Sequence, residues 1–242
     1  MTALVDVLAV FAHPDDAELL VGGALAASVD RGESVGILDL TAGETGSRGT
    51  PEIRAREAQE AARVLGASFR ENAGLPDGGL VNALPMRRQV ASLIRRLRPK
   101  VVVTHWLEGR HPDHREAAAL VVDASFLAGL RNAPEVDGEP HRPFKIIHAL
   151  AFRERAPEPT FLVDVSEQME RRLEAMRRFR SQWEGATGAG ELFPGGDRPM
   201  EEQVRAQLAH YGSLIRAPYA EPFWTREAIR MPSLGSLQVA SF

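Results

Sequence analysis

The sequence predicts an α/β fold, namely a Rossmann-like doubly wound, mostly parallel sheet with helices on both faces. Apolar β-branched runs alternate with helical patterns along most of the chain, which is typical of this class. Right-handed crossovers then place helices on both faces. A chain of 242 residues with 44% hydrophobic composition is long enough for one large core. We therefore expect a single domain, with residues 1–184 as its core and residues 185–242 as a C-terminal extension of loop, helix and tail.

The expected strands are short apolar runs rich in β-branched residues and without polar alternation, as in strands buried in a parallel sheet. Proline bounds several of them: Pro14 ends the first, and Pro99 resets the chain before the third. In chain order, the expected strands are residues 3–12, 35–40, 101–104, 145–152 and 161–165.

The expected helices have apolar residues at helical spacing and recognisable ends. Pro51 lies in the first turn of one helix, and Gly66 follows its last residue. Ser166 is placed to cap the N-terminus of another. In chain order, the expected helices are residues 17–31, 51–65, 85–97, 115–130, 166–183 and 200–211, and a loop rich in Gly and Pro covers residues 185–199.

The composition argues against several classes of partner. The formal charge of −4 comes from 33 acidic and 29 basic residues, mixed along the chain, so we predict neither a nucleic-acid nor an anionic-membrane surface. Because the chain has no cysteine, any metal is held by nitrogen and oxygen donors. No window approaches the roughly 18 apolar residues of a membrane span, and the N-terminus lacks a signal-peptide pattern. We expect a cytoplasmic protein with a small-molecule substrate.

Two short clusters of histidine and aspartate stand out. His-Pro-Asp-Asp occupies residues 13–16, directly after the first expected strand, and His-Pro-Asp-His occupies residues 111–114, shortly after the third. Each cluster alone is equally well explained by helix capping, because Asp15, Asp16 or Asp113 can accept from free backbone amides. Their combination favours chemistry, since both fall at the sheet edge where α/β proteins bind ligands.

Together, the clusters supply the side chains of a metal-dependent hydrolase. A catalytic zinc site takes three protein ligands, and two histidines with one carboxylate form a known set. His13, Asp16 and His114 provide this set. Asp15 and His111 are then free to move protons. The same ligands also suit iron(II), so both Zn²⁺ and Fe²⁺ stay open.

Other polar segments give weaker signals. His105, at the end of an expected strand, is either a packed or capping residue or a group behind the ligands. The glycine-rich residues 43–50 follow the second strand, but no Lys-Ser or Lys-Thr pair completes a phosphate-binding loop. A mobile substrate loop and a plain flexible connection are the two remaining interpretations of this segment.

These residues resemble the LmbE-like or PIG-L family of metal-dependent N-deacetylases. The resemblance rests first on residues 12–18 (Ala-His-Pro-Asp-Asp-Ala-Glu) and on residues 111–114. Residues 43–57 and 74–78 further resemble the members that act on N-acetylglucosaminyl-malate in bacillithiol biosynthesis, and the likeness thins after Gly185. The resemblance thus implies removal of the N-acetyl group from an N-acetylglucosamine derivative. It also permits a homo-oligomer, with a hexamer as one such assembly.

The resemblance implies a role for each catalytic residue. It implies that His13, Asp16 and His114 bind zinc and that Asp15 is the general base for the attacking water. His111 stabilises the tetrahedral intermediate or protonates the departing amine. Asp113 is then expected to fix the tautomer of His111 and to keep its imidazolium charged.

Four further residues are candidates for binding the substrate. Arg54 and Asp77 match family positions that hold the sugar, and Glu44 is a weaker candidate for a sugar contact. Arg110 lies next to the second cluster and is suited to a substrate carboxylate, because a guanidinium binds carboxylates through two parallel hydrogen bonds. An exposed ion pair is the alternative for Arg110.

Several other functions stay open from the sequence. The conjugate could instead carry inositol, an oligosaccharide or an antibiotic. A different metal hydrolase such as a phosphoesterase is less favoured, because a two-metal site needs more carboxylate ligands. A non-catalytic metal-binding or sugar-binding protein is also less favoured, since the proposed base and acid are both present.

Overall fold

One mixed sheet runs through the computed structural model, which describes residues 5–184 and 198–239. Within these residues, the strand order is β3-β2-β1-β4-β5-β7-β6. β1 to β5 pair in parallel, and β7 pairs antiparallel with both β5 and β6. The strands are β1 (Val7–Phe11), β2 (Val35–Thr41), β3 (Phe69–Leu75), β4 (Val101–Thr104), β5 (Lys145–Ala149), β6 (Phe161–Asp164) and β7 (Ala220–Trp224). The predicted α/β fold with a mostly parallel sheet is confirmed.

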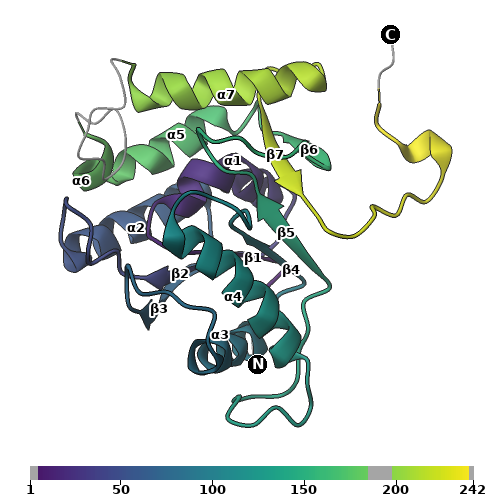
Figure 1. Ribbon diagram of the computed structural model, residues 1–242. Coiled ribbons are helices and arrows are strands. Elements are labelled where there is room, and N and C mark those ends of the chain that lie inside the picture. The colour runs from purple at the N-terminus through teal and green to yellow at the C-terminus, as the bar shows by residue number, and fades with distance from the viewer. Residues whose placement is uncertain (1–4, 185–197, 240–242) are drawn as a thin grey trace.

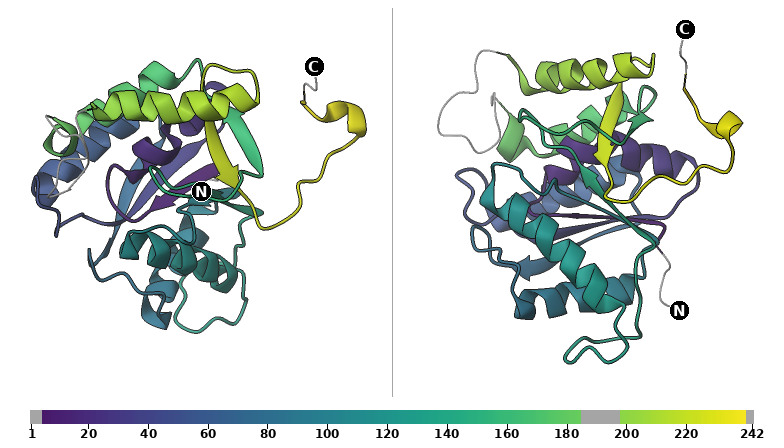
Figure 2. Two further views of the ribbon diagram at one scale, coloured as in Figure 1. Left: turned by 45° about the horizontal axis from the view of Figure 1, so that its top comes forward. Right: turned by 45° about the vertical axis from the view of Figure 1, so that its right-hand side comes forward.

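Helices cover both faces of the sheet (Figures 1 and 2). One face carries α1 (Asp16–Asp30), α2 (Pro51–Leu65) and α5 (Met169–Arg178), and the other carries α3 (Leu84–Leu97) and α4 (Pro112–Ala128). The short α6 (Arg180–Trp183) follows α5, and α7 (Met200–Leu214) packs on the outer side of α5. A 3-10 helix, η1 (Leu234–Ser236), lies in the extended C-terminal segment.

Alternate side chains of the strands fill two cores. In β1, Leu8 and Val10 pack toward α3 and α4, whereas Ala9 and Phe11 pack toward α1, α2 and α5. All four are fully buried. This burial on both faces explains the continuous apolar runs in the sequence, because each residue of a central parallel strand faces one helix layer or the other.

The strand order creates a switch point between β1 and β4. The chain moves outward from β1 to β2 and β3, and then returns to the other side of β1 to form β4 and β5. The loops after β1 and β4 therefore leave the sheet in opposite directions and open a crevice between them. Both histidine clusters lie in these loops.

Some of the observed strands and helices differ from the expected ones. β3 and β7 were not expected, and the strand expected to reach residue 152 ends at Ala149. The expected helix over residues 166–183 is interrupted at the buried Phe179, which separates α5 from α6. Ser166 does not cap it, because α5 begins after Gln168 and the Ser166 hydroxyl donates to Asp164 Oδ1.

The C-terminal part contributes to the sheet, because β7 inserts between β5 and β6. The division of the domain at residue 184 stays a prediction. Of the expected loop over residues 185–199, residues 185–197 lie outside the described residues. Across residues 5–184 and 198–239, every helix falls short of the length and apolarity that a membrane crossing needs.

Candidate metal and catalytic site

The turn between β1 and α1 points its carboxylates away from the helix amides. Asp15 precedes α1 with φ 109° and makes no side-chain capping bond. Left-handed backbone is uncommon for a non-glycine residue, and such strain concentrates at functional sites. The Asp16 carboxylate instead accepts from the backbone N–H of His13 (2.8 Å). Helix capping therefore does not explain these two carboxylates.

The second cluster begins α4 in a different way from the expected one. The helix begins at Pro112, and His111 occupies the capping position. Its Nδ1 accepts from the backbone N–H of Asp113 (3.2 Å). The Asp113 carboxylate is turned elsewhere: its Oδ2 accepts from Gly78 N–H (2.7 Å) and lies 3.3 Å from His13 Nε2. The His111 imidazole thus contacts the backbone N–H of Asp113, whereas we predicted a contact with the Asp113 carboxylate.

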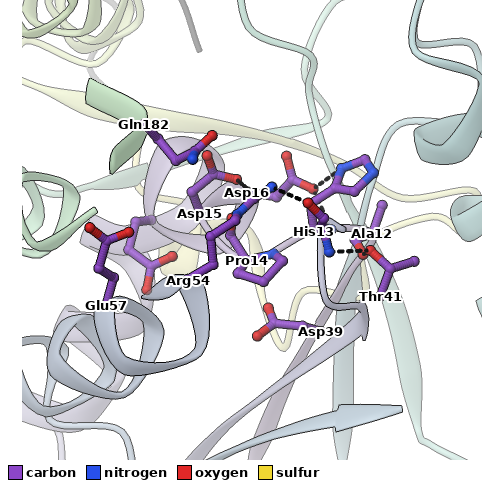
Figure 3. A network of polar contacts seen from close by, with 12 residues as sticks. Ala12, His13, Pro14, Asp15, Asp16, Asp39, Thr41, Arg54, Glu57 and Gln182 are labelled. Atoms are coloured by element: carbon purple, nitrogen blue, oxygen red, sulfur yellow. Dashed lines mark hydrogen bonds and ion pairs between the residues drawn. The ribbon is translucent and has the colours of Figure 1, made fainter. Parts of the chain in front are cut away.

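His13, Asp16 and His114 lie together, with one ligand atom from each within 4.8 Å of the others. Nδ1 of His13 is 3.3 Å from Asp16 Oδ2, and Nε2 of His114 is 3.3 Å from Asp16 Oδ1. Figure 3 shows His13 and Asp16 facing each other where β1 passes into α1. Two imidazole nitrogens and a carboxylate oxygen are donors that suit Zn²⁺ and Fe²⁺. A second group, His13, His111 and Asp113, meets the same distance limit.

The charges at this cluster also favour a cation. Burial lowers the pKa of His13, but hydrogen bonds with Asp113, Asp16 and Asp77 outweigh it and raise this pKa to about 12. Three carboxylates around one imidazole leave an excess of negative charge. A divalent cation neutralises such an excess, and binding releases the proton on the ligand imidazole. The residues therefore fit a metal by both donor type and charge.

His105 supports the cluster from behind. Its Nε2 accepts from the backbone N–H of Ala12 (2.9 Å), which links the ends of β4 and β1. Its ring stacks on that of His114, with centroids 4.0 Å apart and planes 13° apart. Burial lowers the pKa of His105 to about 3, so the ring is neutral. His105 is thus a packed residue that also lies directly behind a candidate ligand.

Arg54 holds Asp15 in place. It is 5% exposed, and it donates to the carbonyls of Pro14 (2.6 Å) and Gly43 (3.0 Å) and to Asp15 Oδ1 (3.4 Å). Figure 3 shows Arg54 beside Pro14 and Asp15. Residue 43 must be glycine, because its φ is +68° and a Cβ there would collide with the guanidinium. Burial raises the pKa of Asp15 to about 7, although Arg54 opposes this shift.

Asp77 and Glu44 join two loops beside the cluster. Asp77 Oδ2 accepts from the backbone N–H and the hydroxyl of Thr45 (2.8 and 2.7 Å), and Asp77 Oδ1 lies 3.0 Å from His13 Nε2. Glu44 Oε1 accepts from the backbone N–H of Asp77 (2.8 Å). These contacts of Asp77 and Glu44, like those of Arg54, are with protein atoms, and the roles of the three residues toward a sugar stay predictions.

A cavity of about 720 Å³ opens over both clusters. Its volume is in the range of small-molecule sites. Arg110 lies in its lining but pairs with Glu154 (Nε to Oε1, 3.6 Å), which is the ion pair that we considered as an alternative. Trp106, Gln182 and Trp183 also line the cavity. Sequence reasoning missed these residues, because no motif marks them and only the packing of α6 brings the last two to the site.

Comparisons with known proteins place the chain in a family. Residues 8–125 match the family model described as PIG-L, GlcNAc-PI de-N-acetylase. The chain is 30% identical over 230 residues to the diacetylchitobiose deacetylase of Thermococcus kodakarensis, covering 89% of this chain and 80% of that protein. It is 28% identical over 237 residues to a probable N-acetyl-α-D-glucosaminyl L-malate deacetylase 2 of Bacillus cereus, covering 90% and 96%.

The similarity extends to a solved structure. The crystal structure of a conserved protein from Thermus thermophilus superposes with a TM-score of 0.84 at 41% identity, covering 94% of this chain and 98% of that one. Similarity along most of the length of these proteins, together with the match to the family model, shows the relationship. The chain belongs to the PIG-L/LmbE-like family of deacetylases.

Proposed function

We propose that this protein removes the N-acetyl group of an N-acetylglucosamine conjugate, using a divalent cation held by His13, Asp16 and His114. The convergence of these three side chains at the switch point carries the proposal. A cation bound there polarises the acetyl carbonyl and makes water easier to deprotonate. We expect zinc, with iron(II) as the alternative.

Asp15 acts as the general base. It lies in the cavity beside Asp16, its backbone is held in a strained conformation, and Arg54 fixes its side chain. A carboxylate with a pKa near 7 is suited to accept a proton at neutral pH. Asp15 takes one proton as the water oxygen attacks the carbonyl carbon. That proton reaches the departing amine when the C–N bond breaks, which gives a free amino sugar and acetic acid, and the acid then loses its proton to become acetate.

His111 stabilises the charge that develops on the carbonyl oxygen. Because its Nδ1 accepts from a backbone N–H, the neutral ring carries its proton on Nε2. His111 also lies in the cavity lining, from which this N–H can donate to the substrate. A positioned donor of this kind stabilises a tetrahedral intermediate. Of the two roles expected for His111, the geometry therefore favours hydrogen bonding over full proton donation.

For the substrate, we propose N-acetylglucosaminyl-malate. The Bacillus cereus relative supports it, as does Arg110 in the cavity lining, which could exchange Glu154 for a malate carboxylate. The Thermococcus relative supports an oligosaccharide instead. A cytoplasmic location in bacillithiol biosynthesis and a homo-oligomeric state stay predictions.

The test is acetate release from N-acetylglucosaminyl-malate, N-acetylglucosaminyl-inositol and diacetylchitobiose, with metal analysis of the same sample. We expect about one metal ion per chain and the highest kcat/KM for the malate conjugate. The Arg110→Met variant should lower kcat/KM for this conjugate and leave that for diacetylchitobiose unchanged. Preference for another substrate would reject malate, and no acetate release from a metal-loaded sample would reject the deacetylase assignment.

A further inference from the structure

A second cavity of about 810 Å³ lies between α3, β3 and the loop of residues 135–139, which we call the acidic loop. Among the described residues, it shares no lining residue with the cavity over the histidine clusters. Its volume is in the range of sites for small organic molecules. Hydrogen bonds join its walls, because Ser92 Oγ accepts from the backbone N–H of Asp137 (2.9 Å) and Gln89 Nε2 donates to the carbonyl of Ala73 (2.6 Å). The cavity is thus a formed part of the fold, separate from the proposed catalytic site.

Arg95 fastens the acidic loop to α3. It is 4% exposed, and its guanidinium donates to the carbonyls of Ala128 (3.0 Å), Leu130 (2.6 Å), Val136 (2.6 Å) and Gly138 (2.9 Å). These bonds engage all three nitrogen atoms of the guanidinium. Arg95 therefore holds the walls of the cavity together and has little capacity left for a ligand.

Two other arginines that line the cavity have donors to spare. Arg88 pairs through Nη1 with Glu135, but its Nε is buried and has no hydrogen-bond partner among the described residues. The side chain of Arg98 makes no hydrogen bond or ion pair within the described part of the chain. Buried donors without a partner are rare in native proteins, and each one calls for an explanation. Both guanidinium groups are suited to bind an acceptor that enters the cavity.

The backbone of Arg98 does not explain why this residue is an arginine. Arg98 follows the last residue of α3 with φ 49°, which lies in the left-handed region. Glycine is the usual residue at such a helix end, because it adopts this conformation without strain. An arginine there costs conformational energy. A role for its side chain would account for the arginine, and the place of Arg98 in the cavity lining offers one.

We propose that this cavity binds a small phosphorylated molecule, with Arg88 and Arg98 holding its phosphate group. A guanidinium binds phosphate through two parallel hydrogen bonds. The side chain of Glu135 is 73% exposed, so its ion pair with Arg88 contributes little, and a phosphate can take its place. Ala73 and Leu93, which also line the cavity, offer apolar surface to the rest of the molecule.

The acidic loop gives the proposal a test of opposite sign. Its three carboxylates, on Glu135, Asp137 and Glu139, are all exposed, so water and salt screen their charges. The Arg88 side chain is only 22% exposed, and Glu135 is the carboxylate that competes for it. Removal of this charge in Glu135→Gln should therefore strengthen the binding of an anion. A purely structural role of the arginines predicts no such gain.

The experiment is calorimetric titration of the purified protein with pyrophosphate and with ADP, at constant ionic strength. We expect saturable binding of both, weakened about 10- to 100-fold in Arg88→Met and in Arg98→Gly, as for the loss of hydrogen bonds to a charged group. Glu135→Gln should bind both more tightly. The control Arg87→Met removes the same charge from the neighbouring position. Because Arg87 donates to Asn82 and does not line the cavity, the affinity of this control should equal that of the parent.

Each alternative gives a distinct result. No saturable binding of pyrophosphate, or parent-like affinity in both folded arginine variants, would overturn the proposal. Loss of binding in His13→Ala would also overturn it, because the anion would then be bound at the proposed metal site. Tighter binding of ADP than of pyrophosphate would support an organic phosphate, and equal binding would reject the organic part of the ligand. Circular dichroism shows whether each variant is folded, and Arg98→Gly decides the question if Arg88→Met is not, since glycine tolerates the backbone conformation at this position.

Discussion

Arg70 is the residue whose replacement tests the structure most directly. It lies on β3 with its side chain 1% exposed, and it donates to both oxygens of Asp39 (2.7 and 2.8 Å) and to Glu18 Oε1 (2.6 Å). The side chains of Asp39 and Glu18 are 4% and 0% exposed. Arg70 thus joins β2, β3 and α1, and its removal leaves two carboxylates buried without a counter-charge.

The expected cost of Arg70→Met follows from this burial. Removal of one partner from a buried ion pair typically destabilises a protein by about 3–5 kcal/mol, because a charge stays buried without compensation. For a chain of this size, that corresponds to a melting temperature lower by about 6 to 20 °C. The matched control is Arg96→Met. Arg96 also pairs with a carboxylate, Glu71, but their side chains are 48% and 36% exposed, so the expected loss is only about 0–1 kcal/mol.

The assay is urea unfolding followed by circular dichroism, repeated between about pH 8 and about pH 5. Burial raises the pKa of Glu18 in the parent, and Arg70 opposes this shift. Without Arg70, the folded variant binds a proton on Glu18 at a higher pH than the folded parent does. Its deficit in stability should therefore narrow as the pH falls. Equal stability of Arg70→Met and Arg96→Met at neutral pH, or a deficit that widens toward low pH, would refute this reasoning.

Three further predictions concern the site and α1. Asp15→Asn should keep the metal content of the parent and lose about 10²–10⁴ in kcat, as expected for a general base, and parent-like turnover would remove Asp15 from the mechanism. His13→Ala should lose both metal and activity. A purified variant that keeps the metal content of the parent would show that His13 is not a ligand. Glu221→Gln should destabilise the fold by about 3–5 kcal/mol in urea unfolding, because the buried Arg172 loses its charge partner; a loss below about 1 kcal/mol would mean that the pair is not needed.

The sequence predicted the central strands and both clusters because their signals are local. Buried runs, prolines and helix-ending glycines identify β1, β2 and β4, and the switch-point rule brings the loops after β1 and β4 together. β3 and β7 lack such signals. β3 is an edge strand whose sequence, Phe-Arg-Glu-Asn-Ala-Gly-Leu, contains no apolar run, and β7 contains Glu221 and Pro222, both poor strand residues.

The contacts around the clusters were less predictable than the clusters themselves. His13 and Asp77 are 64 residues apart, and their contact depends on the conformations of two loops that no periodicity describes. The same holds for Arg54, which the family resemblance assigned to the sugar and which the structure places on the carbonyls of Pro14 and Gly43. Sequence patterns predicted which residues gather at the sheet edge, but not which atoms they present to one another.

The buried pair Arg172–Glu221 helps to explain why the turn between β1 and α1 can keep its strained backbone. Glu221, on β7, accepts from the backbone N–H groups of Gly23 and Ala24 (both 2.8 Å), and Arg172, on α5, donates to the carbonyls of Glu18 (3.0 Å) and Leu19. These contacts reach the backbone in the middle of α1, and a Cβ on residue 23 would lie 2.8 Å from Glu221 Oε1.

Gly22 and Gly23 therefore allow the close approach of Arg172 and Glu221 to α1. Arg172 on α5 and Glu221 on β7 both contact α1. Arg70 on β3 contacts Glu18 of the same helix. A helix fixed from several directions can keep Asp15 at its start in a left-handed conformation, because the rest of the structure determines where this residue lies. The buried charges on α5, β7 and β3 thus help to fix the direction in which Asp15 and Asp16 point.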